Sequence, residues 1–408
     1  MFDLNGLKQA LASRRWSQAE QIAAELESRG RRYEAGVGRL VLAIRFHDAG
    51  LVREVEHGYG DELRRTLEAH RLLARGLYWT AGLAAAAAEL EAVCRHAPGH
   101  GQSPNGDDLA LAAMGRLACD RIQTAFCAEY PSDIDFLPEH LHPVVPGTVN
   151  GHGQEYLLVD TGASTTLLSA DYCRRKGIPL LESYPSTAYD GVGNSVATYP
   201  AFVEKLQIGN AVLGNVITRA AKFPDNLRVA GILSPLDTLR NFPVEFDLSA
   251  GRLRLHSPNA LQGVEWCAGE ECHDARLIWN NGNIFVEADM GMAGAVLLNF
   301  DTGAGANMVT PEFARRNSIE FKMENPVTSF GFGGTVSAYA GFEAPLAVGN
   351  SSPVNSRFLI TPRFAEPAGL DPLDCDGYLG LSWMTGRRML FPRGGQTVRF
   401  TATHPVNG

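Results

Sequence analysis

Apolar residues recur at steps of three and four through the first third of the chain, which is the spacing of amphipathic helices. The recurrence is clearest at the N-terminus, in Phe2, Leu4, Leu7, Leu11, Trp16, Ala19, Ile22, Ala23 and Leu26. It continues over 40–46, 63–74 and 77–93. A Gly/Pro-rich loop at 98–106 precedes one more helix, which Asp107 or Asp108 caps and which runs to about Ala128. Residues 1–130 are therefore predicted to form an all-α domain.

The pattern changes after Pro131. Short apolar runs with alternating polar positions now stand between glycines and other turn residues, which is typical of β-strands. Helical and strand patterns are segregated along the chain, so separate domains are expected rather than an alternating α/β sheet. The expected fold class is therefore multidomain, with an all-α domain followed by an all-β region.

The β region contains an internal repeat. The segment LLVDTGA at 157–163 recurs as LNFDTGA at 298–304, a separation of 141 residues. At the same separation, 169–178 matches 310–319, and each copy has the pattern of a short helix with a hydroxyl N-cap, an inward aromatic residue and outward arginines. Further matches follow in the same order, so we expect two copies of one lobe. The predicted boundaries are a linker at 131–141, a first lobe at 142–256, an inter-lobe linker at 257–274 and a second lobe at 275–402.

Each copy places an aspartate at the end of an apolar run. One Asp-Thr-Gly tripeptide is readily explained as turn chemistry, because Asp and Gly both favour turns. Two copies in the same extended context are not explained in that way. The order of apolar strand, Asp-Thr-Gly-Ala, Gly-rich hairpin and apolar-apolar-Gly segment resembles the aspartic proteases over about 260 of the 408 residues. The Ala after Gly and the short lobes are most similar to the retroviral, retropepsin-like type with its bacterial relatives, whereas two lobes in one chain are similar to pepsin.

The resemblance implies a double acid-protease barrel in which Asp160 and Asp301 are the catalytic residues. Two carboxylates held within hydrogen-bond distance share one proton, so one acts as base and the other as acid at the same pH. Aspartic proteases are the standard example of pKa values set by a neighbouring like charge, and the protonation steps belong to the pair. We therefore expect one water between the two aspartates to attack a peptide carbonyl without a covalent intermediate.

The residues around the aspartates receive supporting roles from the same resemblance. The hydroxyls of Thr161 and Thr302 are expected to bond to the opposite loop, and Gly162 and Gly303 to let backbone amides approach the carboxylates. In this family a strand with an apolar-Gly pattern crosses beneath each aspartate loop. Gly231 and Gly377 resemble the glycines of these two crossings. In the first lobe Ser234 and Pro235 follow this crossing where the second lobe has glycine, so a distorted crossing loop is expected there.

Alanine follows each Asp-Thr-Gly where pepsins usually carry Ser or Thr. Ala163 and Ala304 lack a hydroxyl that bonds a carboxylate and favours its charged form. The dyad is therefore expected to titrate at a higher pH than in pepsin.

Two Gly-rich hairpins resemble the flaps that close over an extended substrate. The flap candidates are Tyr189, Gly191, Gly193, Gly331, Gly333 and Gly334. The alternative interpretation of both segments is an ordinary hairpin turn.

The distribution of charge and the apolar stretches limit which partners are expected. The formal net charge is −9, and nearly all of the acid excess falls in 131–408, with 20 Lys and Arg against 28 Asp and Glu. Neither part of the chain carries an excess of basic residues, so a nucleic-acid partner is not expected. The N-terminus lacks a basic segment followed by an apolar run, and the longest uncharged apolar stretch, 77–88, is too short for a bilayer, so neither export nor a membrane is expected.

The 7 cysteines are scattered and odd in number, which favours reduced thiols in a cytoplasm. Cys267, Cys272 and His273 lack a second ligand pair, so no metal is expected, and no cofactor is either. His140 and His142 are interpreted as loop residues.

The leading hypothesis is a cytoplasmic, single-chain aspartic endopeptidase that takes an extended protein or peptide substrate and processes a specific protein or precursor peptide. One chain suffices for activity, because the repeat supplies both aspartates. The alternative is a catalytically idle peptide-binding or adaptor protein on the same fold. The helical domain is expected to recruit substrate or restrain the site, or else to serve folding or dimerisation.

Overall fold

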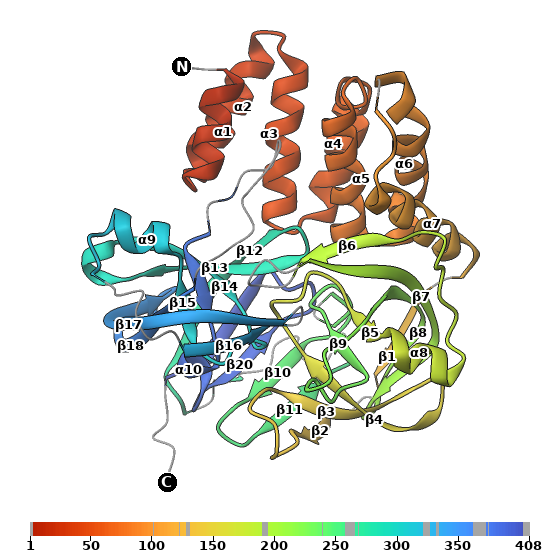
Figure 1. Cartoon of the computed structure of the whole chain (residues 1–408). Helices are drawn as coiled ribbons and strands as arrows, with labels where there is room; N and C mark the ends of the chain where they lie inside the picture. The colour runs from red at the N-terminus through yellow and green to blue at the C-terminus, as the bar shows by residue number, and fades with distance from the viewer. Residues whose placement is uncertain are drawn as a thin grey trace.

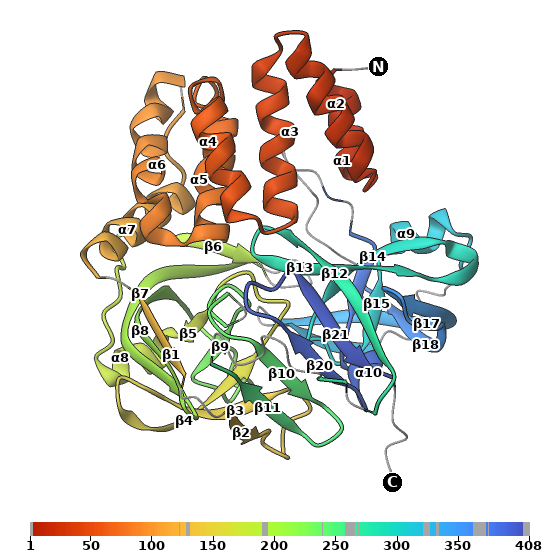
Figure 2. The same cartoon turned by 180° about the vertical axis from the view of Figure 1, so that it is seen from behind.

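A helical domain lies along one side of two β lobes in the computed structural model, and it spans both of them (Figures 1 and 2). The structure describes residues 3–100, 102–121, 123–127, 131–189, 195–238, 240–257, 266–267, 269–320, 327–331, 334–361, 373 and 375–402. The fold class expected from the sequence is confirmed: an N-terminal helical region followed by an all-β region of two lobes.

The helical domain buries the stripe of apolar residues that its periodicity predicts, with Leu7, Leu11, Ile22 and Leu26 all buried. Its helices are α1 (Leu4–Ala12), α2 (Trp16–Ser28), α3 (Arg32–Arg45), α4 (Ala49–Leu63), α5 (Leu67–Ala81), α6 (Leu83–His96), the 3₁₀ turn η1 (Ala97–His100) and α7 (Gly106–Asp120).

The end of the helical domain differs from the prediction. Asn105, rather than Asp107 or Asp108, is the N-cap of α7, and its side chain accepts a hydrogen bond of 2.8 Å from the Asp108 amide. The helix ends at Asp120 and not near Ala128, because 124–127 forms strand β1 (Thr124–Cys127), which pairs with the first lobe.

The first lobe is an eight-stranded sheet in the order β1-β8-β5-β9-β4-β3-β7-β6. Its other elements are β3 (Val144–Val149), β4 (His152–Val159), β5 (Leu167–Ser169), α8 (Ala170–Lys176), β6 (Ser186–Tyr189), β7 (Ser195–Ile208), β8 (Ala211–Ala221) and β9 (Gly231–Leu233). The predicted short helix is α8, with Ser169 as N-cap and Tyr172 buried beneath it.

The second lobe repeats this plan in the same order. Its elements are β12 (Cys272–Asn280), β13 (Asn283–Asp289), η2 (Gly291–Ala293), β14 (Ala295–Phe300), β15 (Asn307–Val309), α9 (Pro311–Arg316), β16 (Val327–Gly331), β17 (Gly334–Val348), β18 (Val354–Ile360) and β19 (Gly377–Leu379). Thr310 caps α9 and Phe313 is buried, as Ser169 and Tyr172 are in the first lobe.

A shared sheet joins the lobes on the face seen in Figure 2, in the order β12-β21-β20-β10-β11-β2. Its remaining strands are β2 (Ser132–Asp135), β10 (Val244–Asp247), β11 (Arg252–Leu255), β20 (Arg388–Phe391) and β21 (Thr397–Thr401), with α10 (Leu381–Met384) beside them. The predicted linkers at 131–141 and 257–274 therefore contribute β2 and the start of β12 to this sheet. Their pairing with distant strands leaves no short-range pattern in the sequence.

The helical domain docks on both lobes through ion pairs and hydrogen bonds. Arg219 of β8 pairs with Asp107 of α7 at 2.6 Å, and Arg14 pairs with Asp376 of the second lobe at 3.4 Å. The buried side chain of Arg45 donates to the Trp279 carbonyl at 3.1 Å.

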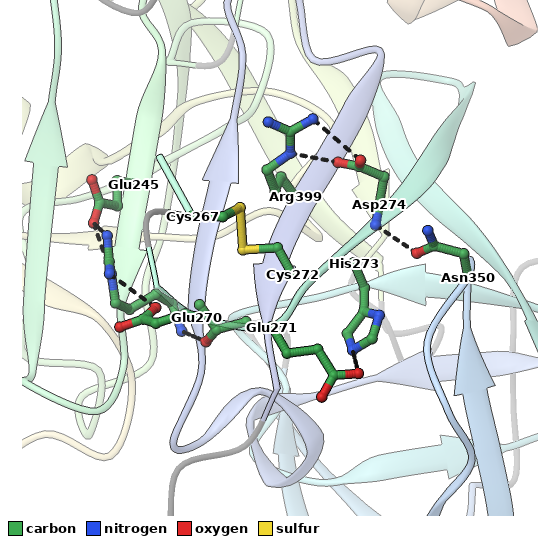
Figure 3. Close-up of a disulfide and its surroundings, with 11 residues drawn as sticks. Glu245, Cys267, Glu270, Glu271, Cys272, His273, Asp274, Asn350 and Arg399 are labelled. Atoms are coloured by element: carbon green, nitrogen blue, oxygen red, sulfur yellow. Dashed lines mark hydrogen bonds and ion pairs between the residues drawn. A yellow bond between two sulfur atoms is a disulfide. The ribbon is translucent and has the colours of Figure 1, made fainter. Parts of the chain in front are cut away.

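Two cysteines differ from the expectation of reduced thiols. Cys267 and Cys272 form a disulfide beside the start of β12, next to the Arg399–Asp274 ion pair (Figure 3). The two are close in sequence, but only the turn between them in the fold brings their sulfur atoms together. The other cysteines are free thiols. In the described part of the chain, no group of three His, Cys, Asp or Glu side chains is placed to hold a metal, and no helix is long and apolar enough to cross a membrane.

Candidate active site

Each aspartate stands where a buried strand ends beside a crossing strand. β4 and β9 run parallel, and the Asp160 amide donates to the Leu233 carbonyl at 3.0 Å. In the second lobe β14 and β19 run parallel, and the Asp301 amide donates to the Leu379 carbonyl at 3.0 Å. The same backbone geometry therefore presents both carboxyl groups.

The crossing strands require glycine because neighbouring backbone passes directly over them. A Cβ at Gly377 would lie 1.9 Å from the Met308 carbonyl oxygen, and one at Gly231 would lie 3.1 Å from the Leu167 carbonyl oxygen. These are the two glycines that the resemblance assigned to the crossing.

The crossing loop of the first lobe is held in the same way as that of the second. The Ser234 amide donates to Thr166 Oγ1 at 3.1 Å, and the Gly380 amide donates to Asn307 Oδ1 at 3.0 Å. The expected distortion of the first crossing is therefore wrong, since a threonine hydroxyl replaces the asparagine carbonyl as acceptor.

Two threonines lock the aspartate loops together across the lobe boundary. The Thr161 amide donates to Thr302 Oγ1 at 3.0 Å, and the Thr302 amide donates to Thr161 Oγ1 at 3.0 Å. The hydroxyls then donate onward, Thr161 to the Phe300 carbonyl at 2.6 Å and Thr302 to the Val159 carbonyl at 2.7 Å. All four bonds are buried, so the relative position of the two loops is fixed by groups that have no water to replace a lost partner.

The two carboxyl groups meet in the space that this lock leaves. Within each loop the second amide bonds the carboxylate, Gly162 to Asp160 Oδ1 at 2.8 Å and Gly303 to Asp301 Oδ1 at 2.7 Å. A Cβ at Gly162 would lie 2.3 Å from Asp301 Cγ, and one at Gly303 would lie 2.6 Å from Asp160 Oδ2. Each carboxyl group is therefore packed against the glycine of the other loop.

The electrostatics of the pair raise both pKa values. Burial raises the pKa of Asp160, and burial together with the charge of Asp160 raises the pKa of Asp301 well above its usual range. The two carboxyl groups interact with each other, so their protonation steps belong to the pair. The singly protonated pair is the state that can supply a base and an acid together.

The flap candidates are only partly within the described residues. β6 and β7 form a hairpin in which Tyr189 faces Ser195, and the Tyr189 side chain is 66% exposed. In the second hairpin Gly331 faces Gly334 across β16 and β17. Gly191, Gly193 and Gly333 lie outside the described residues, so the flap assignment stays a prediction.

Two residues lie near the first aspartate loop although the sequence pattern does not assign them to the site. His142 is interpreted from the sequence as a loop residue, but its imidazole interacts electrostatically with Asp160. Tyr78 of α5 is half-buried and lies near Thr165, in the loop that follows Asp160. The sequence feature that could have identified His142 is its position two residues before β3, the partner strand of β4. No sequence pattern connects Tyr78 to this loop.

Two lobes of one topology, facing each other across paired Asp-Thr-Gly loops, define the aspartic-protease fold in its bilobal form. The β region of this chain has this bilobal fold, with one Asp-Thr-Gly loop in each lobe.

Comparisons with known proteins found one family model and similar solved structures. Residues 145–232, within the first lobe, match the family model described as "gag-polyprotein putative aspartyl protease". Among solved structures, the crystal structure of an aspartic proteinase from Irpex lacteus is similar with a TM-score of 0.41 and 12% sequence identity, over 68% of this chain and 99% of that chain. The comparison with curated proteins found no match.

Proposed function

We propose that this protein is an aspartic endopeptidase that hydrolyses peptide bonds with a water held between Asp160 and Asp301. The observation that carries the proposal is the mutual lock of Thr161 and Thr302, which fixes two interacting carboxyl groups with raised pKa values. An adaptor has no need of either feature.

The proposed chemistry follows from the shared proton. The ionised carboxyl group of the pair takes a proton from the water as that water attacks the scissile carbonyl carbon, and the protonated group donates to the carbonyl oxygen. The resulting tetrahedral diol collapses as a proton passes to the leaving amine. Neither aspartate is permanently the acid, because the proton belongs to the pair.

The finer features of the proposal concern the substrate and the type of aspartic protease. The match to a gag-polyprotein family model over 145–232 supports a retropepsin-like ancestry for the first lobe. An extended segment of a protein or precursor peptide is the proposed substrate, because hairpins beside the site offer strand edges for backbone pairing. A peptide-binding adaptor is the second candidate, favoured only if hydrolysis is absent while peptide binding persists.

A peptide library digested at pH 4 to 8 and analysed by mass spectrometry tests the proposal. Wild-type protein is expected to cleave internal peptide bonds, and Asp160→Asn and Asp301→Asn proteins prepared in parallel are expected to leave the library intact. Equal cleavage by all three proteins would assign the activity to a contaminant and contradict the proposal.

The pH dependence is expected to reach from mildly acidic to neutral pH. Burial raises the pKa of both aspartates, and no hydroxyl at Ala163 or Ala304 counters it, so the dyad keeps its shared proton to higher pH. Ala163→Ser and Ala304→Ser each add a hydroxyl that donates to the charged carboxylate, and each should move the acid limb of kcat/KM to lower pH. A strongly acidic wild-type optimum, or an acid limb that stays in place in both variants, would contradict this explanation.

Activity per chain is expected to be independent of concentration. Both aspartates and both locking threonines come from one chain, so dilution into the nanomolar range should leave specific activity unchanged. The measurement is initial rate per chain over a thousandfold dilution series. A loss of activity that follows dissociation of a dimer would show that the site needs a second chain.

The cellular compartment and the role of the helical domain are further parts of the proposal. A cytoplasmic location is proposed from the sequence, but the Cys267–Cys272 disulfide weighs against a reducing compartment. The helical domain is proposed to restrain the site, because it contacts both lobes and reaches the loop after Asp160 through Tyr78.

A further inference from the structure

The backbone brings His142 to the end of the first lobe's ladder where Asp160 stands. β3 and β4 are antiparallel, with Val144 paired to Leu158, and the ladder continues one step because the Val159 amide donates to the Pro143 carbonyl at 3.0 Å. His142 lies two residues before the first pair of this ladder, Val144 with Leu158, and Asp160 lies two residues after it on the facing strand. This placement agrees with the electrostatic interaction between the two side chains.

The imidazole of His142 also approaches the loop of the other lobe. A Cβ at Gly305, four residues after Asp301, would lie 3.8 Å from His142 Nε2. Gly305 is exposed and the neighbouring residue Leu141 is 91% exposed, so the surface beside His142 is open to solvent. In the described part of the chain neither ring nitrogen of His142 has a hydrogen-bond partner, which leaves both available to a bound group.

The second lobe carries a neutral residue at the matching place. Asn283 lies 141 residues after His142 and two residues before the first pair of β13 with β14, Phe285 with Asn299. The neighbouring hairpin tip is covered by the helical domain, since Arg45 donates to Asn280 Oδ1 at 3.1 Å. One flank of the dyad therefore holds an ionisable group at an open surface, and the other holds an amide beside a docked domain.

We propose that His142 is a specificity-determining residue that binds an acidic side chain of the peptide substrate on one side of the scissile bond. The inference rests on the proposed peptidase function. A substrate carboxylate next to the single negative charge of the dyad is repelled, and a protonated imidazole between them offsets that repulsion. The exposed apolar side chain of Leu141 borders the same surface.

Recognition by His142 depends on pH in a defined direction. The charged and titratable groups that face the imidazole are Asp160 from the end of β4 and His140 from its own loop, while the opposite loop presents the uncharged Gly305. Burial lowers the pKa of His142, so the ring is neutral at neutral pH in the free protein. A bound carboxylate favours the protonated ring, and binding of an acidic peptide therefore takes up a proton. The preference for Glu over Gln should rise as pH falls from about 7 and fade near pH ~4, where Glu itself is protonated.

Matched peptides that carry Glu or Gln at each position flanking one cleaved bond test this proposal. The ratio of kcat/KM for Glu over Gln is expected to reach about fivefold near pH 5, the effect of a partly exposed ion pair, and only for positions on one side of the bond. In His142→Gln protein the ratio should stay near one at every pH. The control variant His140→Gln should retain the wild-type ratio and its pH dependence.

A binding experiment tests the role of His142 separately from the peptidase activity. Asp301→Asn protein retains Asp160 and His142, and fluorescence anisotropy with the labelled Glu and Gln peptides measures affinity whether or not cleavage occurs. Cleavage of the Gln peptide with a flat, pH-independent Glu/Gln ratio would overturn the role of His142 and leave the peptidase standing. Tighter binding of the Glu peptide near pH 5 without cleavage by the wild-type protein would overturn the peptidase and keep the acidic subsite. Equal affinity for both peptides at all pH values would overturn the subsite.

Discussion

Asp160→Asn and Asp301→Asn will each lower kcat/KM for peptide hydrolysis by at least about a thousandfold, the range of a lost general acid or base. Asn is nearly isosteric with Asp, but its amide neither takes a proton from water nor shares one with the remaining carboxyl group. Initial rates on a peptide cleaved by the wild-type protein provide the measurement.

The same substitutions are expected to leave the fold intact. A carboxyl group whose folded pKa is raised destabilises the native state at pH above its unfolded pKa, so replacing it by Asn should hold or raise Tm at pH 7. Asp171→Asn is the matched control, because Asp171 is an exposed acid on α8 of the first lobe. Hydrolysis that survives in either dyad variant, with a normal Tm, would show that the carboxyl pair is not the catalytic group.

Gly162→Ala is expected to inactivate the protein by displacing the carboxyl group of the other lobe. The new Cβ would lie 2.3 Å from Asp301 Cγ, about an ångström inside ordinary contact, so Asp301 must move. A shift of that size in a reacting group lowers the rate by about a hundredfold. The measurement is kcat, since the displacement acts on the chemical step more than on substrate binding.

Gly153→Ala is the control for a Gly→Ala change in the same lobe. A Cβ at Gly153 meets no atom within 4 Å, and its activity and Tm should match those of the wild-type protein. Full activity in Gly162→Ala protein would mean that Asp301 tolerates displacement, and that the tight packing of the carboxyl groups is not needed for hydrolysis.

The sequence predicts the architecture where residues carry a local signal. The 141-residue repeat predicts two equivalent loops, and the threonine bonds join them as the resemblance implies. The sequence also predicts α8 and α9, with their N-caps Ser169 and Thr310 and their inward aromatic residues. A short capped helix can be recognised from about a dozen consecutive residues.

The features that escape prediction depend on contacts between distant segments. β1 and β2 are short and pair with β8 and β11, about 80 to 120 residues away, so no local pattern marks them. His142 acquires its neighbour only through the register of β3 with β4. Tyr78 reaches Thr165 only because the helical domain docks on the first lobe.

The central claim is that the two aspartates of one chain form one hydrolytic site. Active-site titration with a tight-binding statine-type inhibitor tests it most directly, because the inhibitor's hydroxyl replaces the attacking water. Cleavage should fall linearly with added inhibitor and vanish at one inhibitor per chain. An end point at half an inhibitor per chain would place the site between two chains, and cleavage that persists at saturating inhibitor would contradict the dyad mechanism.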